Sequence, residues 1–258
     1  MMTGLFISEL ERTFKRKKTA AVLAVYVGLL AFIWFFLFRM GGGTSFFDAA
    51  HDVKIDSLNS APLFLRELAF VITFIVIPMF VADSFNSEYT SGALRMVLIR
   101  SHHRVKLFFV KWAVQCLLVF LLLSLTWVVG TVVGKVAMPH VNETTFLGGQ
   151  TVGTTGAFLY SLKFYGVCFC IFMAVISIGS ILSVLMPNSI LSYIATIGAL
   201  IGSVYVSDKL SFFFSVTDSV FHELSKSNSE FLVNLLFPIL VISLIINLFV
   251  WKKKEWVG

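Results

Sequence analysis

The sequence is poor in charged residues. Only 13% of its 258 residues are Asp, Glu, Lys or Arg, whereas 58% are hydrophobic. Because soluble domains contain about 25% charged residues, this composition excludes an ordinary soluble protein and is typical of a chain that crosses a membrane several times. We therefore expect an all-α integral membrane protein with a single transmembrane domain that comprises residues 1–258.

Charge is missing above all from the middle of the long hydrophobic runs. A helix needs roughly 20 apolar residues to cross the hydrocarbon core of a bilayer. Six predicted spans meet this need, at about 19–38, 64–82, 112–134, 164–186, 190–206 and 231–251. Proton and ion relays use ionisable groups at membrane depth, so the sequence disfavours a proton-coupled carrier or pump.

Cysteine and recognisable catalytic motifs are also scarce. The three cysteines, Cys116, Cys168 and Cys170, fall inside predicted spans, where we interpret them as small apolar residues. The sequence contains no G-x-S-x-G, no H-E-x-x-H and no pair of carboxylates within a span, so we predict no catalytic residues and no metal site.

One segment, GTVVGKV at residues 130–136, resembles a phosphate-binding loop. It has three residues between its glycines instead of four, and Val136 stands where Ser or Thr would hold magnesium. We interpret the two glycines as a packing contact between helices. The chain is therefore not expected to hydrolyse ATP by itself.

The charges that are present divide unequally between the two sides of the membrane. Residues 1–18, residues 83–111 and the tail after Trp251 hold thirteen basic and five acidic residues, a net charge of +8. The remaining seven basic and nine acidic residues carry −2. The positive-inside rule places the basic side, with both termini, in the cytoplasm. We thus predict a multi-pass plasma membrane protein, and nucleic acid is not an expected partner.

The first hydrophobic run is too long for a cleaved signal peptide and lacks an A-x-A site. Before it, the pattern of Phe6, Leu10 and Phe14 predicts an amphipathic helix that lies on the inner leaflet, where membrane lipid is its partner. A plain basic flank that only sets the topology is the alternative interpretation.

A polar segment, DSFNSEYTSGALRMVLIRSHHRVKLFFVKW, separates the second and third predicted spans. Leu94, Val97 and Leu98 line one face of a short helical pattern, which is too charged to cross the membrane and too apolar for a solvated loop. Such a helix is suited to docking into a groove of a partner protein. Gly92 permits a bend or a close backbone approach at its start.

This segment resembles the first cytoplasmic loop of permeases of the type-2 ABC exporter family. Glu88, Gly92, Leu94, Arg104 and Lys111 match the family pattern, whereas His102 and His103 stand where the family often has proline. We interpret these histidines as loop residues. The topology of six spans with both ends inside and an amphipathic N-terminus also matches.

The resemblance implies a function and a mechanism. The loop would form a coupling helix seated in a separate ATPase subunit, with Glu88, Gly92, Leu94, Val97, Leu98 and Arg104 at the contact. ATP and magnesium would bind to that subunit, and no cofactor to this chain. A second permease copy or a sister permease would complete the exporter, and the cargo would be amphipathic, peptide, antibiotic or lipid-like. A membrane scaffold without transport activity is the alternative, and an intramembrane enzyme or channel is a third.

Two further features concern the spans themselves. Between Ser207 and Glu230, apolar residues recur at helical spacing, which predicts re-entrant or interfacial helices on the outer side before the last span. Ser177, Ser180 and Ser183 lie at intervals of three beside Gly179, and we interpret them as a close helix contact; a substrate path is the alternative. The two long outer segments near residues 41–61 and 135–156 are expected to be loops.

Overall fold

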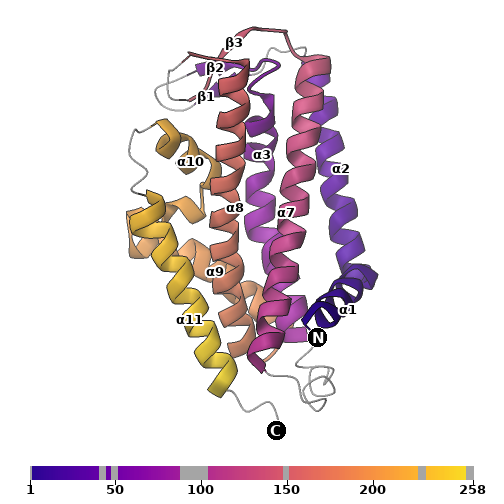
Figure 1. Cartoon of the computed structure of the whole chain (residues 1–258), viewed down its shortest axis with the longest axis vertical. Helices are drawn as coiled ribbons and strands as arrows, with labels where there is room; N and C mark the ends of the chain where they lie inside the picture. The colour runs from indigo at the N-terminus through magenta and orange to yellow at the C-terminus, as the bar shows by residue number, and fades with distance from the viewer. Residues whose placement is uncertain are drawn as a thin grey trace.

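The computed structural model describes residues 2–40, 45–47, 52–87, 104–147, 151–225 and 231–253. Long helices run along the longest axis of the molecule, with short hairpins at one end and the N-terminal helix across the other (Figure 1). Among the described residues, six helices are long and apolar enough to cross a membrane: Lys17–Arg39, Ser60–Ser87, Arg104–Ala137, Thr154–Leu185, Ser189–Val206 and Asn234–Lys253. The predicted number of spans is therefore confirmed, as is the helical class.

The elements follow one another in a simple order. The first half contains α1 (Met2–Lys15), α2 (Lys17–Met40), β1 (Ser45–Phe47), β2 (Asp52–Lys54), α3 (Ser60–Val71), η1 (Ile72–Val76), α4 (Ile77–Val81) and η2 (Ala82–Ser87). The second half contains α7 (Arg104–Ala137), β3 (Glu143–Thr145), β4 (Thr151–Gly153), α8 (Thr154–Leu185), α9 (Ser189–Val206), η3 (Asp208–Phe213), α10 (Val216–Ser225), η4 (Leu232–Leu236) and α11 (Phe237–Lys253).

Two helices are longer than the sequence predicts. Helix α7 begins at Arg104 and α8 at Thr154, although the apolar runs were expected to begin at residues 112 and 164. A lysine just before each run, Lys111 or Lys163, marks the edge of the apolar stretch but does not end a helix. The 34 residues of α7 correspond to about 51 Å, more than the roughly 40–45 Å of a whole bilayer. Its ends therefore reach the headgroup layers.

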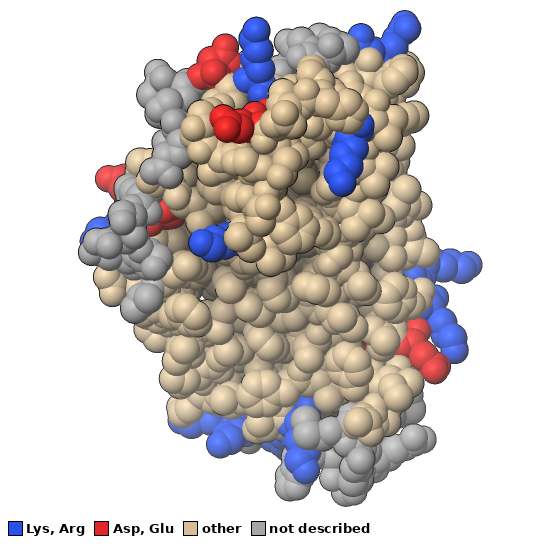
Figure 2. Space-filling view, turned by 45° about the horizontal axis from the view of Figure 1, so that its top comes forward, with Lys and Arg blue, Asp and Glu red and all other residues tan. Residues whose placement is uncertain are grey.

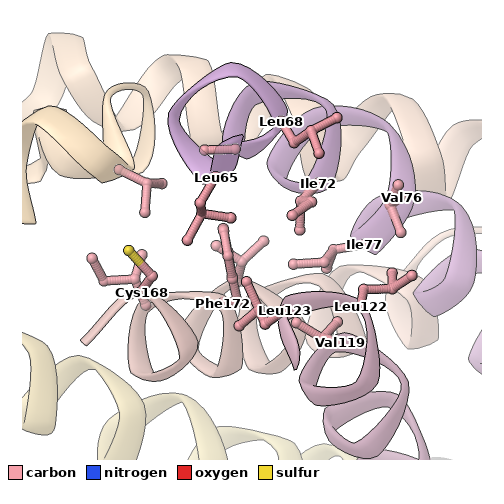
Figure 3. Close-up of a cluster of buried hydrophobic side chains, with 14 of the residues drawn as sticks. Leu65, Leu68, Ile72, Val76, Ile77, Val119, Leu122, Leu123, Cys168 and Phe172 are labelled. Atoms are coloured by element: carbon pink, nitrogen blue, oxygen red, sulfur yellow. The ribbon is translucent and has the colours of Figure 1, made fainter. Parts of the chain in front are cut away.

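The core lies where the second, third and fourth spans meet. Figure 3 shows Leu65, Leu68, Ile72, Val76 and Ile77 of the second span facing α7 and α8. Their partners there are Val119, Leu122, Leu123, Cys168 and Phe172. All ten side chains are buried. Because this interior is apolar, Cys116 and Cys168 are buried as free thiols, as expected, and Cys170 is half-buried.

The other three spans lie at the periphery. The spans differ in the buried share of their most apolar stretch. This share is 72% in Ser60–Ser87 and 61% in Thr154–Leu185, but only 17% in Lys17–Arg39 and in Ser189–Val206. Large apolar side chains such as Phe32 and Ile190 are exposed there. A broad uncharged area occupies the face shown in Figure 2, and most charged side chains lie toward its ends and margins. Such a surface is suited to contact with lipid.

Two spans contain a wide π-helical turn before a proline. The N–H of Ile77 donates to the carbonyl of Ile72, and that of Phe237 donates to the carbonyl of Leu232, five residues back in each case. Pro78 and Pro238 follow directly. A proline lacks an N–H and its ring presses on the carbonyl four residues earlier, so an added residue in the preceding turn relieves the clash.

The segments near residues 41–61 and 135–156, which were expected to be loops, contain two short antiparallel hairpins instead. Strand β1 pairs with β2, and β3 pairs with β4, each over three residues. Asp56 joins the two regions, because its carboxylate accepts a hydrogen bond from Thr144 at 2.5 Å. Strands of three residues in Gly- and Thr-containing sequence are too short to show the alternation on which strand prediction depends.

The region between Ser207 and the last span folds as two short helices, η3 and α10. Helix α10 packs against α8 through Phe221 and Phe164, whose ring centres lie 4.5 Å apart. It is also tied to α3, since Arg66 Nε donates to Asp218 Oδ1 at 2.9 Å. Residues 208–213 and 216–225 are thus helical, whereas their predicted position at the membrane surface stays a prediction.

The serines of α8 form close helix contacts, as expected. Ser180 Oγ donates to Asn247 Oδ1 of α11 at 2.9 Å, and Asn247 Nδ2 donates to the carbonyl of Ser177 at 2.8 Å. Ser183 shares a hydrogen bond of 2.5 Å with Ser192 of α9. All of these side chains are buried, so the serines hold three helices together rather than face an open path.

The glycines of the GTVVGKV segment pack against the start of α3. A methyl group on Gly130 would lie 2.9 Å from the Cα atom of Ala61, which is closer than van der Waals contact allows. We expect Gly130→Ala to destabilise the protein by about 1–3 kcal/mol through overpacking. Gly202→Ala is the matched control, because no atom lies within 4 Å of the added methyl group. Unfolding free energies in detergent test this, and equal values for the two variants would contradict it.

Candidate functional site

The candidate site is the end of the bundle where α1 lies. The predicted coupling segment connects Ser87 and Arg104, which are both at this end. Predicted partner-binding residues Glu88, Gly92, Leu94, Val97 and Leu98 lie outside the described residues, as do His102 and His103. Arg104 is the exposed first residue of α7. The helices on either side of the segment, η2 and α7, are described. Helix α7 pairs with α1 through charged groups, and η2 pairs with the residues that follow α1.

The first charged contact joins α1 to α7. Lys111 is fully buried, and its Nζ donates to Glu9 Oε1 at 2.9 Å and to the backbone carbonyl of Ser84 at 3.0 Å. The other carboxylate oxygen of Glu9 accepts from Arg12, one turn along α1. A buried ammonium is tolerated only with such partners, because an unpaired buried charge is costly. The ion pair therefore fixes α1 against α7.

The second charged contact joins the α1–α2 junction to the end of the second span. Arg16, between α1 and α2, donates from Nη1 to Asp83 Oδ2 at 2.7 Å and to the Asp83 carbonyl at 3.1 Å. Lys18 lies 3.4 Å from the other carboxylate oxygen. Asp83 is in η2, four residues before Ser87. The N-terminal helix is thus fastened to both chain segments that border residues 88–103.

The faces of α1 follow from these contacts. Glu9 and Thr13 are on its buried side, whereas Phe6 and Leu10 are half-buried. Phe14, the third residue of the predicted apolar face, is 43% exposed. Glu11 and Lys15 form an i, i+4 pair on the exposed side at 3.4 Å. Helix α1 is therefore amphipathic, but the two residues on its buried side, Glu9 and Thr13, are polar.

An apolar groove of about 650 Å³ runs between α1 and α7. Its lining residues are Thr3, Phe6, Ile7, Phe109, Val110, Trp112 and Ala113. The ion pair of Glu9 and Lys111 joins the same two helices, and neither residue lines the groove. The groove shows that α1 and α7 meet through their charged groups, while their apolar side chains leave open space.

An aromatic cluster ties the last helix to the same end. Trp251 of α11 is fully buried, and its ring centre lies 6.1 Å from that of Phe85 and 5.7 Å from that of Phe108. Asn86 in η2 donates to the carbonyls of Ser183 and Met186 at the end of α8, at 2.8 and 2.6 Å. Four spans thus converge on η2, directly before residue 88.

The electrostatics of Glu9 reflect its partners. Burial raises the pKa of a carboxyl group, but the positive charges of Lys111 and Arg12 outweigh it and hold the pKa of Glu9 below its ordinary value. Glu9 is therefore charged at neutral pH. In the described part of the chain, no three His, Cys, Asp or Glu side chains come together in a way that could hold a metal ion.

Sequence analysis did not foresee the pair of Glu9 and Lys111, because both residues were treated as charges that set the topology. One signal was available. Lys111 is flanked on both sides by apolar residues, from Leu107 to Val110 and from Trp112 to Val114. A lone cation inside such a helical run needs a partner, and only a carboxylate from outside the spans can supply one.

Comparison with known proteins does not identify the chain: it matches no protein-family model and no curated protein.

Breaking the buried ion pair should be costly. Glu9→Gln leaves the Lys111 ammonium buried without a carboxylate, and we expect a destabilisation of about 3–5 kcal/mol. Glu11→Gln is the matched control, since that carboxylate is exposed and its loss should cost less than about 1 kcal/mol. Unfolding of the detergent-solubilised protein, followed by tryptophan fluorescence, measures both. Similar values for the two variants would show that the pair does not hold α1.

The docking of α1 should also resist moderate acid. A carboxyl group whose pKa is lowered on folding stabilises the folded state at every pH above its unfolded pKa, which is 4.5 for glutamate. This stabilisation is lost only as the pH falls through the lower pKa of the folded state. Spin labels at exposed Ser8 and Lys106 should therefore report an unchanged distance from neutral pH to below 4.5, then separation. In the Glu9→Gln variant, this separation of the two labels at low pH should be absent. Separation well above pH 4.5 would contradict the assignment.

Proposed function

We propose that the chain is the permease subunit of an ATP-driven ABC exporter. Three features support the proposal: the six apolar helices, the sequence pattern from Glu88 to Lys111, and the way in which the segment's two borders are fastened. ATP and magnesium bind to a separate ATPase subunit, and a second permease copy or sister permease completes the transporter.

The fastening of both borders is the observation that carries the proposal. Asp83 on one side of residues 88–103 and Lys111 on the other both pair with α1 or the residue after it. A force applied to the segment would reach α1, the second span and α7 together. A solvated loop needs no such fastening, whereas a coupling helix needs a rigid base. We therefore assign docking on the ATPase to Glu88, Gly92, Leu94, Val97, Leu98 and Arg104.

We propose that this end faces the cytoplasm. It carries the three basic segments, and α1 and the last turn of α11 with Lys252 and Lys253 lie at the same end (Figure 1). Exposed Ile7 and Phe14 and the apolar groove suit a helix in the interface of the inner leaflet. On this orientation we expect η3 and α10 to be interfacial helices on the outer side.

The cargo class follows from the character of the spans. Apart from Lys111 at the α1 end, the described side chains buried between the middles of the spans are apolar or neutral, such as Thr126, which shares a 2.5 Å hydrogen bond with Tyr26. A path between such helices suits an amphipathic, peptide, antibiotic or lipid-like molecule better than a free ion. The plasma membrane is the expected location.

A substitution in the coupling segment tests the function. Leu94→Asp replaces an apolar contact worth about 1.5–3 kcal/mol with an unpaired carboxylate in the partner's groove. The permease should still insert, because no span changes. It should lose co-purification with its ATPase, or lose ATP turnover that responds to cargo. Gly92→Val should act likewise if the backbone there is closely approached.

Leu94→Met is the matched control, since it keeps an apolar side chain of similar volume and should bind normally. The measurement is a pull-down of the tagged permease from native membranes, followed by an ATPase assay in reconstituted vesicles. Full partner binding and coupled turnover in both Leu94→Asp and Gly92→Val would reject the coupling role and favour a scaffold without transport activity.

A further inference from the structure

A cavity of about 220 Å³ lies at the end of the bundle opposite α1, between the upper parts of α7 and α8 and the start of α3 (Figure 1). Its polar lining consists of Ser57, Ser60, Thr131, Lys135, Thr154 and Ser161. Trp127 and Phe158, with ring centres 5.6 Å apart, form an aromatic wall. Pockets for whole organic ligands measure about 300–1,000 Å³, so this cavity suits the headgroup of a larger molecule.

Ser161 points to a ligand in this cavity. The residue is only 4% exposed, and no described residue pairs with its hydroxyl group. Other hydroxyls of the lining are satisfied by the protein: Ser60 donates to the carbonyl of Gly130 at 3.0 Å and Thr131 to that of Trp127 at 2.7 Å. The hydroxyl of Ser161 is reached from the cavity, so it pairs with whatever fills that space, water or a ligand. A ligand with hydrogen-bonding oxygens would supply what Ser161 lacks.

The charges around the cavity favour an anion. Lys135 lies in the last turn of α7, and it forms no ion pair with a described carboxylate. The lining contains no acidic residue. Helix α8 begins beside Thr154 without a side-chain cap, so the N–H groups of its first turn lack intrahelical partners. A lysine near the C-terminus of α7 is favourable in itself, because its charge offsets the negative end of the helix dipole. The helix dipole does not account for Ser161, whose hydroxyl has no described partner. A phosphate would engage both.

The position of the cavity connects it with lipid. Helix α7 is long enough to reach through both headgroup layers, and Lys135 is two residues from its end. Phe158 is 52% exposed on the surface of α8, so the cavity lies beside a surface suited to acyl chains. We propose that it binds the phosphate of an anionic phospholipid, whose chains leave along Phe158. Free phosphate has the same chemistry as the headgroup, but it has no acyl chains that could contact the apolar surface at Phe158.

Native mass spectrometry of the purified chain, titrated with dioleoylphosphatidylglycerol, tests the site. Lys135→Gln should weaken binding of the first lipid roughly tenfold, because a charge-assisted hydrogen bond is lost. Ser161→Ala should weaken it roughly threefold. Lys163→Gln is the matched control: it removes the same charge from an exposed residue of α8 outside the cavity, and should change affinity by less than about twofold.

Two ligand arms separate the sources of phosphate. Dioleoylphosphatidylcholine, which has no net charge, should bind at least about fivefold more weakly than phosphatidylglycerol. Inorganic phosphate should displace the lipid only at much higher concentration. Equal affinities of Lys135→Gln and Lys163→Gln would overturn the site, and inorganic phosphate that binds as tightly as the lipid would overturn the lipid assignment. The assay needs no ATPase, so its outcome is independent of the proposed transport function.

Discussion

A single buried cation sets the arrangement of one end of the molecule. Lys111 lies on a helix that is otherwise apolar around it, and its ammonium has no contact with solvent. Such a charge must be paired, and Glu9 supplies the partner from a separate helix at 2.9 Å. Helix α1 therefore has to lie across the base of the bundle (Figure 1). The carbonyl of Ser84, the second acceptor, requires η2 to lie there as well.

The second span is the element that links this end to the core. It is the most buried of the six, yet it contains two π-helical stretches, one before Pro78 and one that holds Asp83. Wide turns of this kind are held by surrounding contacts and mark functional segments in many helices. Here the second stretch is surrounded by Arg16, Trp251 and the end of α8, so its irregular backbone is fixed from three sides.

The sequence predicts the parts of the structure that depend on composition and periodicity. Six spans, the helical N-terminus and the serine contacts of α8 follow from uncharged runs and helical spacing. The hairpins do not, because three residues are too few for a period to appear. Nor does the pair of Glu9 and Lys111, since 102 residues separate them and only the packed structure brings them together. The cavity lined by Lys135 and Ser161 likewise combines residues from three helices that no local pattern connects.

The two ends of the bundle differ in how α3 and α7 are joined. Near the hairpins the helices touch directly, because Gly130 and Gly134 admit Ala61 and Ser60 to close contact. At the other end, the second span and α7 are joined through charged groups of α1 and the carbonyl of Ser84. Small-residue contacts leave little room for separation, whereas ion pairs can exchange partners or admit water. The second span and α7 are therefore held by small-residue packing near the hairpins, and by buried charged groups and the ring contact of Phe85 with Phe108 near α1.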